Sequence, residues 1–250
     1  MHITVLDIET TGLFKFDANN VLVPDILEVA YAMVDTSNML IGKHGVLYFY
    51  KPEFDIESPA QEIHHLTREF LEQYEDQFED NLIALATLMT NATVLGKNVE
   101  KFDIPFINRF IEKYKGNMYD IEKIVDYAEM KNYDKTGNVF HENYVQPVDL
   151  QKLYAPIYRL KKYYDGFGKL DDLVNQRIPK AEWSGLHFDG HKKGKLGEYV
   201  DLTPGAREMI DEVYGSLTKD RETREHGALY DVVMTYVMYL FYLQEVTYLT

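Results

Sequence analysis

The sequence predicts a mixed α/β or α+β domain. Its N-terminal part contains three short apolar stretches, rich in β-branched residues and separated by turn-forming residues, which is the pattern of β-strands. Farther along, apolar residues recur at three- and four-residue spacing, as in amphipathic helices, and short strand-like stretches lie between them. Strands that come first and are followed by helices mixed with strands favour this fold class.

The individual elements follow from these two periodicities. Strands are expected at residues 3–8, 26–34, 46–50, 93–95 and 121–126. Helices are expected at residues 67–74, 81–89, 102–114, 150–154, 170–175, 204–214 and 230–243. The stretch 177–201 is rich in Gly, Lys and His, and we interpret it as an insertion into a single domain spanning residues 1–250.

Composition excludes several classes of site. The chain has 250 residues and no cysteine, so a disulfide scaffold, a thiolate nucleophile and a cysteine metal site are excluded. Its formal net charge of −15 is the wrong sign for holding long nucleic acid by phosphate neutralisation. A site that holds only a chain end through metal ions needs little basic surface, because the ions supply the positive charge.

Neither a targeting segment nor a membrane span is predicted. Residues 1–9 lack a positive n-region and contain two carboxylates. The longest uncharged run, residues 232–243, is too short for a bilayer, which takes roughly 20 residues. We therefore expect a soluble, cytoplasmic protein with no membrane partner.

Two carboxylates stand at the end of the first predicted strand. Strand alternation places Asp7 and Glu9 on one face, with Ile8 turned into the core. Paired carboxylates on an apolar strand are costly unless neutralised, and a divalent cation that prefers hard oxygen ligands would neutralise them. In isolation the pair is more simply interpreted as a hydrated strand end, because short motifs match often by chance.

Three ordered motifs change that interpretation. Residues 7–13 read DIETTGL, residues 95–103 read LGKNVEKFD, and residues 226–231 read HGALYD. Together they resemble the motifs of the DEDDh-type 3′→5′ exonucleases, the DnaQ-like family that includes the proofreading epsilon subunit of bacterial DNA polymerase III. Residues 63–67 (IHHLT) and 168–173 (GKLDDL) resemble two intermediate markers of the same family, so the resemblance spans almost the whole chain.

The resemblance implies a ribonuclease H-like fold, with a mixed sheet of about five strands flanked by helices. It also implies a metal-dependent 3′→5′ exonuclease that releases nucleoside 5′-monophosphates from nucleic-acid 3′ ends. The expected ligands of two divalent cations, Mg²⁺ or Mn²⁺, are Asp7, Glu9, Asp103 and Asp231. His226, which precedes Asp231 by five residues, is the expected general base.

Substrate contacts are also implied by the resemblance. The expected contacts are Thr10, Leu13, His64 and Phe102, with Leu13 wedged between the last two bases. Core packing is an equally good interpretation of Leu13 and Phe102, because both residue types are usually buried. One departure from the family pattern is His65, which stands where the family has glycine.

Three functions are consistent with the sequence. We favour DNA over RNA as the substrate, in proofreading or end trimming, with a DNA polymerase as a partner in trans. One alternative is an exoribonuclease that trims short RNA. The other is a non-catalytic polymerase-docking module with the same fold, which the presence of all four carboxylates and His226 argues against.

Overall fold

The protein is described by a computed structural model. The described residues are 2–13, 15–18, 23–90, 92–114, 145–150, 152–153, 177–179, 199–201, 205–218 and 227–249. The chain forms two compact units, which we describe separately: residues 1–148 with 223–232, and residues 149–222 with 233–250. A single domain with an insertion at 177–201 stays a prediction, because most of that stretch lies outside the described residues.

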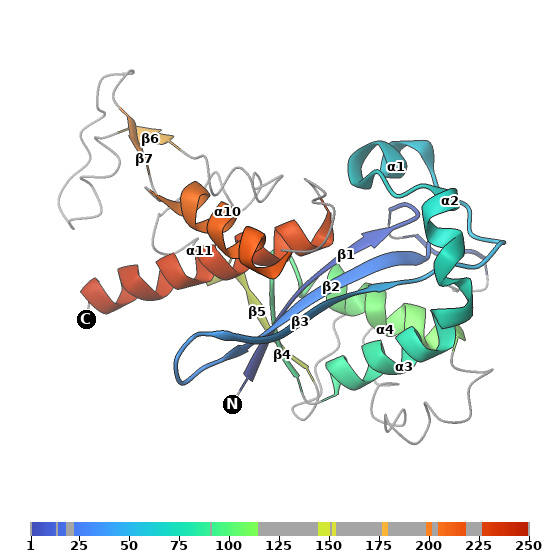
Figure 1. Cartoon of the computed structure of the whole chain (residues 1–250), viewed down its shortest axis with the longest axis horizontal. Helices are drawn as coiled ribbons and strands as arrows, with labels where there is room; N and C mark the ends of the chain where they lie inside the picture. Colours follow the sequence, from blue (N-terminus) through green and yellow to red (C-terminus); the bar gives the residue numbers. More distant parts are fainter. Residues whose placement is uncertain are drawn as a thin grey trace. The chain divides into compact units, whose positions relative to one another are not determined.

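A five-stranded mixed sheet forms the centre of the first unit (Figure 1). Its strands are β1 (His2–Thr10), β2 (Ile26–Asp35), β3 (Ile41–Tyr48), β4 (Ala92–Gly96) and β5 (Val145–Asp149), in the order β3-β2-β1-β4-β5. The central strand β1 pairs antiparallel with β2 and parallel with β4, and β2 pairs antiparallel with β3. The predicted mixed sheet of about five strands is therefore confirmed.

The fifth strand is not where the sequence pattern predicts it. The strand expected at residues 121–126 lies outside the described residues, and β5 supplies the fifth position. Pro147 interrupts the apolar pattern of β5. A proline is tolerated there because β5 is last in the sheet order, where one side of the strand needs no ladder hydrogen bonds.

Helices α3 (Phe78–Met89) and α4 (Asp103–Tyr114) pack their apolar sides against one face of this sheet (Figure 1). The core between them includes Leu6 and Ile8 of β1, Leu82 of α3 and Ile107 of α4, all buried. This packing fixes the direction of every second residue of β1, because side chains alternate across a strand.

Three shorter helical segments precede α3. They are α1 (Ser58–His64), α2 (Arg68–Leu71) and the 3₁₀ helix η1 (Glu72–Gln77). The helix predicted at 67–74 corresponds to α2 and the start of η1, where Thr67 caps α2 by accepting a hydrogen bond from the Phe70 amide. Helix α1 has only seven residues, too few to show a clear 3.6-residue pattern, and was not expected.

The described part of the chain also contains two longer helices and a two-stranded sheet. Helices α10 (Ala206–Leu217) and α11 (Ala228–Leu249) match the predicted helices 204–214 and 230–243, and β6 (Arg177–Pro179) pairs antiparallel with β7 (Tyr199–Asp201). Residues 228–232 of α11 belong to the first unit. The helix predicted at 170–175 lies outside the described residues. Among the helices that the structure describes, none combines the length and apolar character needed to span a lipid bilayer.

Candidate active site

Strand β1 presents two carboxylates on the face opposite the α3–α4 core. Leu6 and Ile8 are buried in the core, and Asp7 and Glu9, which alternate with them, are half-buried. A carboxylate oxygen of Asp7, one of Glu9 and one of Asp231 all lie within 4.8 Å of one another. The structure therefore brings together three of the four predicted metal ligands.

The other two acidic residues of the predicted set stand in the first turns of helices. Asp231 lies in the first turn of α11, where the Gly227 carbonyl accepts the amide hydrogens of Tyr230 and Asp231 at 2.9 and 3.4 Å. Asp103 is the first residue of α4 and is 3% exposed. The positive end of a helix dipole favours a carboxylate, so both positions help to keep negative charge close to β1.

The charges around Asp7 disfavour its ionised form. Burial raises the pKa of the Asp7 carboxyl well above its ordinary value. The neighbouring carboxylates that raise this pKa further are Asp231, Asp103, Glu9 and Glu28. A bound divalent cation would reverse this balance, and the oxygen donors of Asp7, Glu9 and Asp231 suit Mg²⁺ or Mn²⁺.

Glu28 is a member of this acidic group that sequence reasoning missed. It lies on β2 directly opposite Glu9 in the antiparallel register and is 2% exposed. Residues directly opposite in a sheet share a face, so Glu28 adds negative charge beside the predicted ligands. Its signal in the sequence is a single carboxylate within the apolar strand 26–34.

Of the two histidines predicted for the site, only His64 is among the described residues. His226 lies outside the described residues, so its role stays a prediction. His64 is 2% exposed, and its Nδ1 accepts a hydrogen bond of 2.9 Å from the Leu66 amide. That bond requires an unprotonated Nδ1, so the neutral imidazole carries its hydrogen on Nε2.

The segment after β1 exposes the predicted wedge residue. Leu13 is 79% exposed, which rules out core packing for this side chain. The Thr10 hydroxyl donates a hydrogen bond of 2.8 Å to the Gly12 carbonyl and so folds the segment back on itself. Phe102, by contrast, is half-buried against the core, with its ring centroid 5.6 Å from that of Phe106.

Two left-handed residues explain details of the motifs. Asn98 has φ 57°, and its carbonyl accepts the amide hydrogens of Lys101 and Phe102, so it forms the turn that leads into α4. His65 has φ 58° at the C-terminus of α1. Glycine is the default residue for this conformation, which accounts for the glycine expected at position 65 from the family pattern.

The sequence profile described as "RNase_T: Exonuclease" matches residues 4–162. The chain belongs to this exonuclease family. The resemblance to the DEDDh-type exonucleases and the expected enzyme class are thereby confirmed, and membership implies a divalent-metal requirement. No curated protein sequence matches the chain significantly.

Solved structures of exonucleases share the fold of this family member. A 3′-exonuclease described as full-length has a TM-score of 0.51 at 13% identity, with 98% of this chain and 82% of that one covered. A 3′-exonuclease that recognises the histone mRNA stem-loop has a TM-score of 0.50 at 13% identity, with the same coverage. Escherichia coli exonuclease I with a dT13 oligonucleotide has a TM-score of 0.47 at 14% identity, covering 98% of this chain and 41% of that one. The chain thus spans about two fifths of exonuclease I. At 13% identity, the likeness to the two 3′-exonucleases shows the fold alone.

Proposed function

We propose that the protein is a metal-dependent 3′→5′ exonuclease that releases nucleoside 5′-monophosphates. The observation that carries this proposal is the cluster of carboxylate oxygens from Asp7, Glu9 and Asp231, within 4.8 Å of one another on an exonuclease-family fold. Such a cluster is costly without a counter-charge, and a cation is the counter-charge that phosphodiester hydrolysis also needs.

The four carboxylates divide the work of holding two divalent ions, Mg²⁺ or Mn²⁺. By resemblance to the family, Asp7 would contribute to both sites, Glu9 and Asp231 would complete one, and Asp103 would support the other. When bound, the ions supply activation of the attacking water and stabilisation of charge on the phosphate and the leaving oxygen. The helix starts at Asp103 and Asp231 keep these ligands fixed relative to β1.

The exposed side chain of Leu13, the predicted wedge residue, supports action at the end of a nucleic-acid strand. Leu13, exposed and four residues beyond Glu9, is available to pack against the last bases of a strand, with Thr10 beside it. Apolar side chains that stack on bases bind without regard to sequence. A terminal nucleotide held there places the last phosphodiester bond over the carboxylates, which predicts mononucleotide products from the 3′ end.

DNA is the substrate we favour, and short RNA is the alternative. One structural neighbour recognises a histone mRNA stem-loop, and another holds a dT13 oligonucleotide, so the fold serves both nucleic acids. Proofreading in trans for a DNA polymerase is one role that DNA cleavage would serve. The polymerase-docking alternative without catalysis is disfavoured, because the sequence retains all four predicted carboxylates, and three of them, Asp7, Glu9 and Asp231, lie together.

Digestion of matched DNA and RNA strands tests this function. Strands of one sequence carry a label at the 5′ end and are incubated with Mg²⁺ or Mn²⁺ or with EDTA, alongside a closed single-stranded circle. We expect a ladder shortened from the 3′ end, release of 5′-mononucleotides, no cleavage in EDTA and an intact circle. Cleavage of the circle, or full activity in EDTA, would refute the proposal.

His226 is the proposed general base. It immediately precedes Gly227, whose carbonyl accepts hydrogen bonds from the amides of Tyr230 and Asp231 at the start of α11. We expect His226→Ala to lower kcat by about 10²–10⁴-fold, the usual contribution of a general base, while metal-induced stabilisation is retained. Near-normal kcat in this variant would exclude the role and would direct attention to Tyr230, the nearest tyrosine.

A further inference from the structure

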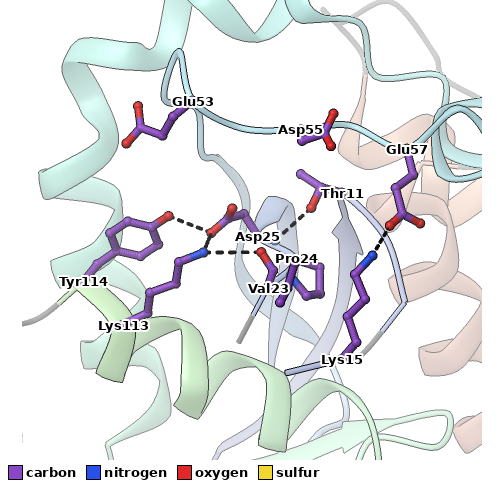
Figure 2. Close-up of a pocket in the computed structure, with 10 residues that line it drawn as sticks. All are labelled: Thr11, Lys15, Val23, Pro24, Asp25, Glu53, Asp55, Glu57, Lys113 and Tyr114. Carbon is purple, nitrogen blue, oxygen red and sulfur yellow. Dashed lines mark hydrogen bonds and ion pairs between the residues drawn. The ribbon is translucent and has the colours of Figure 1, made fainter. Parts of the chain in front are cut away.

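Asp25 is a further buried carboxylate, and its backbone is bonded to the loop that follows β1. It lines a cavity of about 440 Å³ together with residues of the loop after β1, the segment before α1 and the end of α4 (Figure 2). The Asp25 carboxylate accepts hydrogen bonds of 2.6 Å from both the Lys113 ammonium and the Tyr114 hydroxyl. Asp25 is thereby anchored to the C-terminal end of α4.

The backbone of Asp25 is joined just as closely to the loop after β1. The Thr11 amide donates to the Asp25 carbonyl, and the Asp25 amide donates to the Thr11 hydroxyl, both at 2.8 Å. Thr11 is 2% exposed, so water does not compete for these bonds. Leu13, only two residues farther on, is exposed, so the loop passes from a buried, hydrogen-bonded residue to a solvent-exposed one within two positions.

The same loop is held on its other side by Glu57, the residue before α1. The Glu57 amide donates to the Thr11 carbonyl at 2.9 Å, and its carboxylate pairs with Lys15. A Cβ added at Gly12 would come within 2.6 Å of the Glu57 carboxyl carbon, so a side chain here would require the Glu57 side chain to move. Thr11 is thus bonded through its amide, its hydroxyl and its carbonyl.

These contacts connect the wedge to a predicted metal ligand through one rigid element. Helix α4 begins with Asp103 and ends with Tyr114, so its twelve residues carry a predicted metal ligand that acts electrostatically on Asp7 at one end and a partner of Asp25 at the other. Burial and the nearby charge of Asp25 raise the pKa of Tyr114, so the phenol stays protonated and remains a donor. Thr10 at the end of β1 and Leu13 in the loop that follows are therefore connected, through Thr11 and Asp25, to the helix that begins with Asp103.

We propose that Asp25, anchored by Lys113 and Tyr114, is a positioning residue that sets the placement of Thr10 and Leu13 against the terminal nucleotide. This inference rests on the proposed function, because it assigns Asp25 a role in holding the 3′ end. Asp25 touches neither the carboxylate cluster nor the reacting bond, so it acts through Thr11 on the wedge. A positioning role, unlike a contribution to fold stability, requires Leu13 for its effect on substrate binding.

Steady-state kinetics on a single-stranded 3′ end, with and without Leu13, tests this role. Asp25→Ala should raise KM by about tenfold and change kcat by less than about twofold, since a misplaced contact weakens binding before it alters chemistry. In a Leu13→Ala background, the same change should alter KM by less than about twofold, because coupled residues are not additive. Equilibrium binding with Ca²⁺ in place of the catalytic ion should show the same pattern.

The matched control is Asp55→Ala, which removes an exposed carboxylate from the same cavity. It should leave KM unchanged. If Asp25→Ala does not fold, Tyr114→Phe decides: a smaller rise in KM that requires Leu13 supports the inference, and a wild-type KM overturns it.

An equal rise in KM in both Leu13 backgrounds, or the same rise in Asp55→Ala, would also overturn the inference. Wild-type protein that neither binds nor cleaves a 3′ end would refute the proposed function, and this inference would fall with it. Normal wild-type cleavage with an unaffected Asp25→Ala would overturn this inference alone.

Discussion

Asp7 is half-buried and Asp25 is buried, and desolvation raises the pKa of both aspartates, yet their surroundings differ. Around Asp25, hydrogen bonds from Lys113 and Tyr114 oppose the effect of burial and keep the carboxylate compensated. Around Asp7, the neighbouring charges that act on it are carboxylates, and they add to the effect of burial.

The difference separates a carboxylate that is paired with a cation within the fold from one that is surrounded by other carboxylates. The Asp25 carboxylate is paired with the Lys113 ammonium, and the Asp25 backbone is bonded to Thr11. Asp25 therefore has its counter-charge within the fold and needs no ion from solution. The carboxylates around Asp7 repel one another, so a positive charge beside them would stabilise their ionised form. Among strongly perturbed carboxylates, those whose perturbation is not offset by nearby cations are therefore the stronger candidates for metal binding.

Removal of the Asp7 charge gives the largest expected effect. Asp7→Asn should lower turnover by roughly 10³-fold or more, since bound metal contributes several kcal/mol to the transition state. The same change should raise the free energy of unfolding of the metal-free protein, because asparagine has no buried charge to desolvate. Turnover and urea unfolding in EDTA measure the two effects, with Asp55→Asn as the control. Retained turnover, or a less stable metal-free variant, would break the comparison.

Removal of the cation beside Asp25 should have an intermediate effect on stability. Lys113→Met keeps the aliphatic stem but leaves a buried carboxylate without its ammonium, at a cost of about 1–3 kcal/mol. The pKa of Asp25 should rise further, so the loss is greatest above that pKa and shrinks as acid protonates the carboxyl. Lys15→Met breaks a more exposed pair in the same cavity and should cost only about 0–1 kcal/mol. Equal losses in the two variants, or a loss that grows in acid, would contradict this account.

The pH dependence of metal stabilisation should be smaller still. Because the folded-state pKa of Asp7 is raised, metal-free stability falls as pH rises from the unfolded pKa to the folded one. Metal binding requires the ionised carboxylates, so the increase in Tm caused by Mg²⁺ should be larger at about pH 7.5 than at about pH 5. Thermal unfolding with and without Mg²⁺ measures this difference. A metal-induced shift that is independent of pH would show that Asp7 does not titrate with binding.

The sequence predicted the acidic site better than its surroundings. Asp7 and Glu9 share a face because strand alternation is strict, and Asp231 joins them as the motif order implied. Glu28 was missed because its proximity depends on the register between β1 and β2, which no local pattern reveals. The bonds from Asp25 to Lys113 and Tyr114 span 88 and 89 residues and arise only from tertiary packing.

Fold prediction shows the same division. Strands β1 and β2 and helices α3 and α4 have strong periodicity and were placed to within a few residues. Strand β5 was missed because Pro147 and Asp149 break its apolar run, and its pairing depends on the sheet edge. Leu13 shows the limit for single residues, since its exposure is fixed by the bonds of Thr11 and not by its own type.

Calorimetric titration with Mn²⁺ tests the central claim most directly, because it measures binding without turnover. Wild-type protein should bind about two ions per chain, as a two-metal hydrolase requires. Asp7→Asn should lose this binding, and Asp25→Asn should retain it, since among the described residues Asp7 lies beside other carboxylates whereas Asp25 is paired with Lys113. No binding by the wild-type protein, or equal binding by Asp7→Asn, would contradict the account.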